Sequence, residues 1–136
     1  MLFSNSDMLQ VVAAVIERNG EILIGRRKRG QSHPLKWEFP GGKVERDETP
    51  GQALARELEE ELGVRGASGE EIIRYEYAYP GKHPIQLIFF RVKEFTGEPR
   101  NLIFQEMRWE RPARLAAFDF VEGDLPFLQR LRAESD

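Results

Sequence analysis

The chain has 136 residues, with 20 basic and 23 acidic side chains, a net charge of −3 and no cysteine. This length favours one domain that buries its own core, and no apolar stretch approaches the roughly 18 residues of a membrane span. The charge excludes a strong field for nucleic acid or an anionic membrane, and the absence of cysteine excludes disulfides and thiolate chemistry and fits a cytoplasmic protein.

A β-hairpin is predicted near the start of the chain, after residues 1–7, which have no periodicity and are expected to be flexible. Two runs rich in valine and isoleucine, 9–17 and 21–25, flank Asn19-Gly20. Asn-Gly is the pair that a type I′ turn prefers, because both residues tolerate positive φ. A polar, basic loop at 26–36 follows.

A helix is predicted over Thr49–Leu62, after a short apolar run at 37–39 that ends at Pro-Gly-Gly. Thr49 is the expected N-cap, with Gln52 three residues later, and Gly63 lies just past the helix end. Its apolar residues recur at helical spacing and predict one buried stripe.

Further strands are predicted at 70–79, 85–95 and 106–110, and a closing helix at 124–133. Three tyrosines alternate along the first of these strands and would share one sheet face, either to pack or to stack on a base: Tyr75, Tyr77 and Tyr79. This order of strands and helices indicates an α/β (α+β) sandwich around a mixed β-sheet.

Three acids share one face of the predicted helix, because Glu57, Glu60 and Glu61 are spaced i, i+3, i+4. They repel one another and lie near the helix C-terminus, where the macrodipole disfavours anions. A hard divalent cation such as Mg²⁺ would reverse the sign of this arrangement. A solvated acidic face would explain the helix taken alone.

The flanking residues favour the cation. Gly42, Glu48 and the run Arg56-Glu57-Leu58-Glu59-Glu60-Glu61-Leu62-Gly63-Val64 fill every specified position of G-x5-E-x7-R-E-U-x-E-E-x-G-U, where U is a bulky aliphatic residue. This segment resembles the Nudix box. The resemblance implies a single Nudix hydrolase domain over residues 1–136, with an α/β/α sandwich and a loop–helix–loop catalytic motif.

By position, the resemblance implies that the box acids Glu57, Glu60 and Glu61 hold one or more Mg²⁺ or Mn²⁺ ions. The carbonyl of Gly41 would be an extra ligand. A glutamate, with Glu57 one candidate, or a second metal ion would activate the attacking water.

Two further positions follow from the same resemblance. Arg56 would pair with Glu48 or another box acid and fix the loop on the helix, although a plain surface arginine is the alternative. The family often adds a metal-ligating glutamate before the tryptophan matched by Trp109. The position in register with MutT is Ile103, but Glu106 lies near it and could reach the metal.

Outside the box, Gly25-Arg26-Arg27 and the run from Trp37 to Lys43 are similar to the MutT-like branch, which removes damaged nucleoside triphosphates. The resemblance implies that Arg27 contacts substrate phosphate. It also implies a base pocket lined by His33, Phe39 and Asp124. A core role for Phe39 and a loop role for His33 are the alternatives.

Asp124 departs from the branch, because relatives acting on 8-oxoguanine place an asparagine there. An ionised carboxylate only accepts hydrogen bonds, which favours a base with an exocyclic amine, such as cytosine or adenine. This substitution resembles relatives that act on cytidine nucleotides. The competing interpretation makes Asp124 the N-cap of the last helix.

The leading hypothesis is a metal-dependent pyrophosphohydrolase that converts (deoxy)nucleoside triphosphates, modified or damaged ones in particular, to monophosphate and pyrophosphate. Such nucleotide-pool sanitation serves DNA repair. The alternatives are an ADP-ribose or dinucleoside polyphosphate hydrolase and a catalytically silent nucleotide-binding sensor. The expected partner is the nucleotide substrate, with no nucleic acid or membrane, in a monomer or homodimer.

Overall fold

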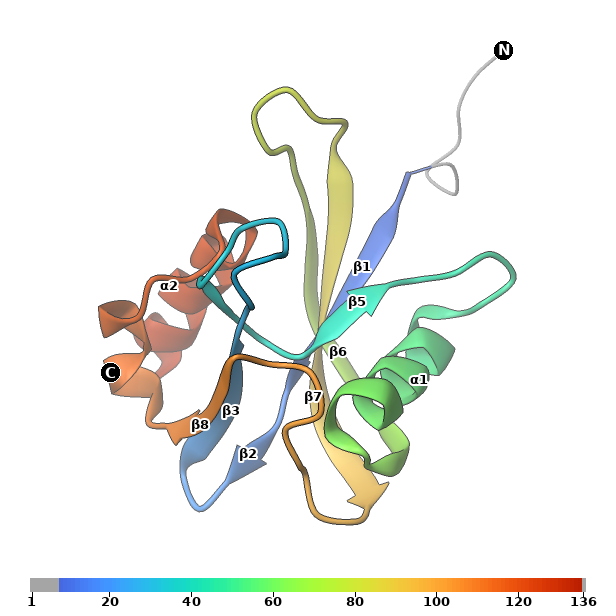
Figure 1. Cartoon of the computed structure of the whole chain (residues 1–136), viewed down its shortest axis with the longest axis vertical. Helices are drawn as coiled ribbons and strands as arrows, with labels where there is room; N and C mark the ends of the chain where they lie inside the picture. The colour runs from blue at the N-terminus through green and yellow to red at the C-terminus, as the bar shows by residue number, and fades with distance from the viewer. Residues whose placement is uncertain (1–7, 136) are drawn as a thin grey trace.

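A mixed sheet lies at the centre of the fold, with one α-helix on each side of it (Figure 1). The computed structural model describes residues 8–135, so the predicted flexibility of residues 1–7 lies outside the described residues. The strands are β1 (Gln10–Val15), β2 (Glu17–Arg18), β3 (Glu21–Arg26), β4 (Trp37–Glu38), β5 (Gly41–Lys43), β6 (Arg65–Tyr77), β7 (Ile85–Thr96) and β8 (Glu106–Glu110). The helices are α1 (Pro50–Leu62), the 3₁₀ helices η2 (Pro112–Ala117) and η3 (Glu122–Asp124), and α2 (Leu125–Ser135).

The central sheet has the strand order β5-β1-β7-β6. Its middle pair, β1 and β7, is parallel, with Gln10 opposite Gln86 and Val15 opposite Arg91. The other pairs are antiparallel. In the second sheet, β3 pairs with β2, β4 and β8, all antiparallel.

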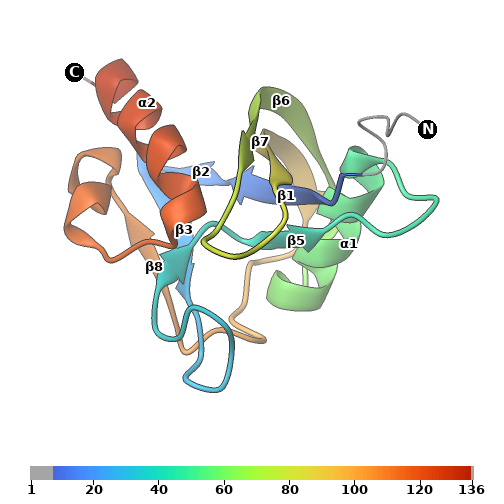
Figure 2. The ribbon, with the colours of Figure 1, turned by 90° about the horizontal axis from the view of Figure 1, so that it is seen from above.

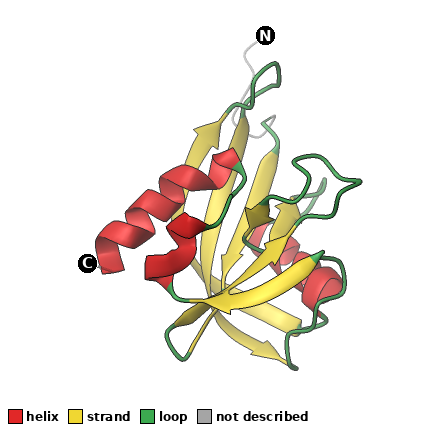
Figure 3. Cartoon of the chain, turned by 60° about the vertical axis from the view of Figure 1, so that its left-hand side comes forward, coloured by secondary structure: helices red, strands yellow, loops and turns green. Residues whose placement is uncertain are grey.

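Two cores lie on opposite faces of these strands, because side chains alternate along a strand. In β1, Val12 and Ala14 pack toward α1, whereas Ala13 and Val15 pack toward α2. The same alternation divides the buried residues of β7 and β3 between the two cores. Figures 2 and 3 show the helices on either side of the strands. The predicted α/β/α sandwich around a mixed sheet is confirmed.

The hairpin turn forms as predicted, with φ of 54° at Asn19 and 78° at Gly20. The prediction that residues 9–17 form one strand of this hairpin was wrong, however. Only β2 pairs with β3, while β1 enters the other sheet. The run 9–17 therefore breaks at Ile16, a buried residue between β1 and β2 that joins the core under α1.

The segment before α2 is fixed to β4. The N–H of Trp37 donates to the carbonyl of Asp119 at 2.9 Å, and the N–H of Val121 donates to the carbonyl of Trp37, also at 2.9 Å. These bonds bring η3 beside the chain that leads into β5. Within residues 8–135, no helix is long and apolar enough to cross a membrane.

Candidate active site

The helix α1 presents the box acids in a fixed orientation. Thr49 Oγ1 accepts the N–H of Gln52 at 3.1 Å, and Gln52 Oε1 accepts the N–H of Thr49 at 2.9 Å, which forms the predicted capping box. At the other end, Gly63 is left-handed with φ of 72°. The predicted stripe of Ala53, Leu54, Leu58 and Leu62 is fully buried.

The main chain of β5 runs close to the box acids. The N–H of Gly41 donates to Glu61 Oε1 at 3.1 Å. A Cβ on Gly42 would lie 2.5 Å from the carboxyl carbon of Glu57, and one on Gly41 would overlap the carbonyl of Val12. The two glycines therefore let the chain pass between β1 and the acids.

Burial makes two of the box acids, Glu57 and Glu61, hard to ionise. Glu61 is only 8% exposed, and burial, reinforced by the nearby charge of Glu38, raises its pKa to about 9. Burial also raises the pKa of Glu57, which is hydrogen bonded to Glu61. Two carboxyl groups this close are stable when they share a proton or a cation.

Arg56 makes the pairing with Glu48 that the sequence predicts. Its Nε and Nη2 donate to the two oxygens of Glu48 at 2.7 and 2.9 Å, and Nη2 also donates to the carbonyl of Lys43 at 2.9 Å. Its Nη1 donates to Glu57 Oε1 at 2.9 Å. The hydrogen bonds from Arg56 lower the pKa of Glu48 to about 2. Arg56 thus ties the loop before α1 to the box.

The donor set around α1 fits a hard divalent cation. Glu57, Glu60, Glu61 and the carbonyl of Gly41 offer only oxygen, which Mg²⁺ and Mn²⁺ prefer. Burial is the main cause of the raised pKa values of Glu57 and Glu61, and the charges of neighbouring carboxylates add to it. Among residues 8–135, no three acidic or histidine side chains are already gathered as a metal site. Instead, Arg56 lies 2.9 Å from Glu57 and 3.4 Å from Glu60.

A pocket of about 260 Å³ brings together all four residues predicted for substrate binding. They are Arg27, His33, Phe39 and Asp124. The backbone of Gly41, next to Glu61, lines the same pocket. The cavity therefore extends from the predicted base-binding residues to Gly41 and Gly42, which contact Glu61 and Glu57, while no acid of α1 is among the described residues that line it.

Asp124 is the buried acid of this pocket, with 5% of its surface exposed. Burial, and then the charge of Glu38, raises its pKa to about 8, while a hydrogen bond from the main chain of Phe39 opposes the shift. The ring of Phe39 packs among Phe89, Phe120 and Phe127, so Phe39 has a core role as well as a place in the pocket.

Glu38 is the pocket residue that the sequence reasoning missed. Its carboxylate accepts Arg27 Nη1 at 3.1 Å through each oxygen, and its charge raises the pKa of both Glu61 and Asp124. It therefore lies between the two ends of the site. A signal was present, since Glu38 is an acid between the two apolar aromatics Trp37 and Phe39.

The remaining predicted residues are peripheral. Arg27 is held by Glu38 and by the carbonyl of Ser32 at 2.7 Å. His33 is exposed at the pocket rim. Glu106 is exposed at the start of β8, 3.8 Å from Arg108, and is not among the described residues that line the pocket.

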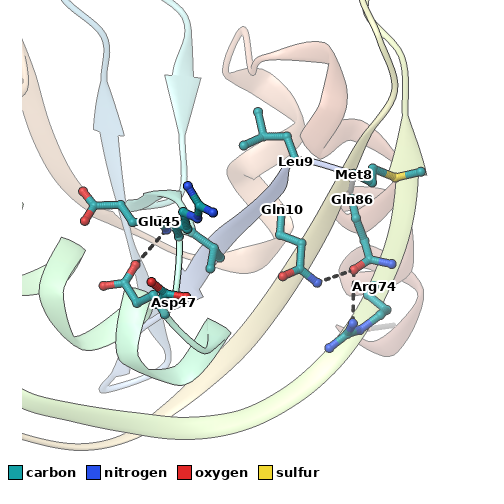
Figure 4. A pocket seen from close by; sticks show the side chains of 10 residues that line it. Met8, Leu9, Gln10, Glu45, Asp47, Arg74 and Gln86 are labelled. Atoms are coloured by element: carbon teal, nitrogen blue, oxygen red, sulfur yellow. Dashed lines mark hydrogen bonds between the residues drawn. The ribbon is translucent and has the colours of Figure 1, made fainter. Parts of the chain in front are cut away.

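A larger hollow, of about 680 Å³, lies outside this site (Figure 4). At its wall, Gln86 Oε1 accepts both Gln10 Nε2 at 2.8 Å and Arg74 Nη1 at 3.1 Å. None of the ten predicted site residues lines it. The smaller pocket is therefore the candidate active site, because the predicted substrate-binding residues line it and do not line the larger hollow.

The NUDIX domain model matches residues 8–131, which include the capped helix and the pocket. The chain belongs to the Nudix family. It is 37% identical over 126 residues to the CTP pyrophosphohydrolase of Escherichia coli, covering 93% of each chain. It is 39% identical over 129 residues to the 8-oxo-dGTP diphosphatase of Haemophilus influenzae, covering 94% of each.

Solved structures agree with this assignment. The E. coli ORF135 protein has a TM-score of 0.82 and 35% identity, with 96% of this chain and 94% of that chain covered. A MutT structure from a study of Aliivibrio salmonicida and Vibrio cholerae has a TM-score of 0.76 and 32% identity, with 93% and 98% covered. The predicted resemblance to MutT-like Nudix hydrolases is confirmed, and this Nudix protein is a hydrolase.

Proposed function

We propose that this Nudix protein is a metal-dependent pyrophosphohydrolase of (deoxy)nucleoside triphosphates, modified or damaged ones in particular, in nucleotide-pool sanitation. The observation that carries the proposal is the continuous pocket between Asp124 and the glycines beside Glu57 and Glu61. A nucleotide laid along it would place its base at one end and its phosphates at the other. The names of the relatives described above support the same substrate class.

At the phosphate end, Glu57, Glu60, Glu61 and the carbonyl of Gly41 would hold Mg²⁺ or Mn²⁺. When bound, the ion supplies neutralisation of phosphate charge and a lower pKa for water. Glu57 is one candidate for the base that takes the proton of that water, because burial raises its pKa and so makes its ionised form a stronger proton acceptor. Arg56 keeps Glu57 and the loop in place. Attack of that water on an internal phosphorus would form a new bond from phosphorus to the water oxygen and break the bond of this phosphorus to the α–β bridging oxygen, which yields monophosphate and pyrophosphate.

At the base end, Asp124 would read the base edge and Phe39 would form a wall of the pocket. Arg27 would contact phosphate. In the described structure, Glu38 holds the Arg27 guanidinium at the rim. An ionised Asp124 would favour a base that presents an amine, and a neutral one could also donate a hydrogen bond. The cytoplasmic location and the monomeric or homodimeric state stay predictions from the sequence.

The first test is a panel of substrates with Mg²⁺ or Mn²⁺ at pH 8–9, with products separated by chromatography. It compares dCTP, 5-methyl-dCTP, 8-oxo-dGTP, 2-hydroxy-dATP, ADP-ribose and diadenosine tetraphosphate. Pyrophosphate released from one triphosphate far above the others supports the proposal and names the base. Cleavage of ADP-ribose alone, or nucleotide binding without turnover, would contradict it.

The second test concerns the box. Glu60→Gln and Glu61→Gln remove charge without changing shape, so each should lower kcat by at least about a hundredfold, with circular dichroism unchanged. Glu59→Gln, an exposed glutamate on the same helix, is the matched control and should keep normal turnover. Near-normal activity in both box variants would show that the metal assignment is wrong.

A further inference from the structure

Three tyrosines from the end of β6 and the loop after it contact the turn that carries Asp124. Tyr75 Oη donates to the carbonyl of Gly123 at 2.6 Å, and Tyr77 Oη donates to Glu122 Oε2 at 3.2 Å. Tyr79 Oη accepts the N–H of Gly123 at 2.9 Å. The face shared by the alternating tyrosines therefore meets η3.

Tyr79 differs from the other two because it also lines the pocket. Its ring packs against the ring of His33, with centroids 4.5 Å apart and planes tilted by 41°. Both rings belong to the same cavity as Asp124. Tyr79 thus joins the basic loop, the β6–β7 connection and η3. Figure 2 shows that connection reaching toward the beginning of α2.

The contact between Tyr79 and η3 is close. A Cβ at Gly123 would lie 2.8 Å from Tyr79 Oη, which is closer than real Cβ contacts. Gly123 is buried and its neighbour Asp124 is 5% exposed, so a shift of this turn would move the acid within the pocket. The main-chain N–H of Gly123 would be left without this acceptor if the hydroxyl were removed.

We propose that Tyr79 is a positioning residue for base selection, which holds Asp124 through the N–H of Gly123 and holds His33 through ring contact. This inference rests on the proposed function of the pocket. Selectivity among bases depends on polar groups held at fixed points. The hydroxyl of Tyr79 therefore affects which base fits, while the acids of α1 carry the chemistry.

The test compares Tyr79→Phe with Tyr77→Phe, a matched control that removes a hydroxyl from the adjacent alternating position. Affinities for CMP, AMP and GMP are measured by calorimetry without metal, so the readout does not depend on turnover. Hydrogen exchange of the Gly123 amide is followed by NMR. In Tyr79→Phe, we expect faster exchange at Gly123, and a preference between the best and worst base that shrinks about threefold to tenfold.

With the best triphosphate, KM should rise in Tyr79→Phe while kcat stays near the wild-type value. Tyr77→Phe should leave exchange at Gly123, base preference and KM unchanged. Gly123→Ala forces the same contact apart from the other side and should reproduce the loss of preference, even if Tyr79→Phe folds poorly.

Wild-type base preference retained in both Tyr79→Phe and Gly123→Ala would overturn this inference alone. Equal effects of the two tyrosine variants would also overturn it, because they would show general loosening. If the wild-type protein hydrolyses none of the triphosphates in the substrate panel, the proposed function fails and the inference fails with it.

Discussion

Asp124 is a buried acid whose protonation makes the stability of the fold depend on pH. Its pKa is raised to about 8 from an ordinary value of 3.8. Between pH 4 and 8 the folded protein therefore binds a proton that the unfolded chain releases, and stability falls as pH rises through this window.

Asp124→Asn removes this titration. The variant's free energy of unfolding relative to wild type should increase from pH 5 to pH 8, by a few kcal/mol at most, and its relative melting temperature should rise with it. Thermal unfolding of both proteins at pH 5, 6, 7 and 8 measures it. A difference in melting temperature between the two proteins that stays the same from pH 5 to pH 8 would contradict the raised pKa of Asp124.

At the scale of residues, the sequence predicted which acids belong to the site better than it predicted which residues lie close together in space. The box gave Glu57, Glu60 and Glu61 because their spacing on a helix is local. Glu38 was missed because its importance comes from lying near both Glu61 and Asp124, 23 and 86 positions away along the chain. The aromatic neighbours of Glu38 in the sequence indicate a partly buried acid, but no local pattern indicates that it lies near Glu61 and Asp124.

At the scale of elements, both ends of α1 are capped, by the capping box at Thr49 and by left-handed Gly63. Gly63→Ala places a Cβ in a left-handed conformation and 2.9 Å from Arg100 Nη2, so it should lower the free energy of unfolding by about 1 kcal/mol or more.

Gly51→Ala is the matched control on the same helix. Gly51 lies in the first turn, without positive φ, and an added Cβ would lie 4.0 Å from Thr49 Oγ1, its nearest neighbour. Alanine there should stabilise by up to about 1 kcal/mol. Urea unfolding of both variants tests the contrast, and a loss of similar size in both would contradict it.

The same locality explains which elements the sequence could predict. The capping box and the Asn19-Gly20 turn are decided within a few residues, so α1 and the hairpin were correct. The break at Ile16 was not predicted, because it depends on β1 leaving β3 to pair with β5 and β7. Which strands pair in a sheet depends on tertiary contacts, and strand propensity does not predict it.

For the whole molecule, a cation should bind the folded state and stabilise it. At about a hundredfold excess over its Kd, Mg²⁺ should add about 2.7 kcal/mol, which is a rise of several degrees in melting temperature for a domain of this size. EDTA should abolish the rise. Glu57→Gln should lose most of it and Glu59→Gln should keep it. An equal rise in both variants would place the ion elsewhere.

The parallel pair at the centre of the sheet has a consequence for synthesis of the chain. Gln10 and Gln86, which face each other across β1 and β7, are 76 positions apart. At about 5–20 residues per second, a ribosome needs several seconds to make the partner that β1 requires. During that interval the apolar, β-prone run from Val11 to Ile16 lacks its native partner strand β7. A chaperone that binds extended apolar segments would bind this run.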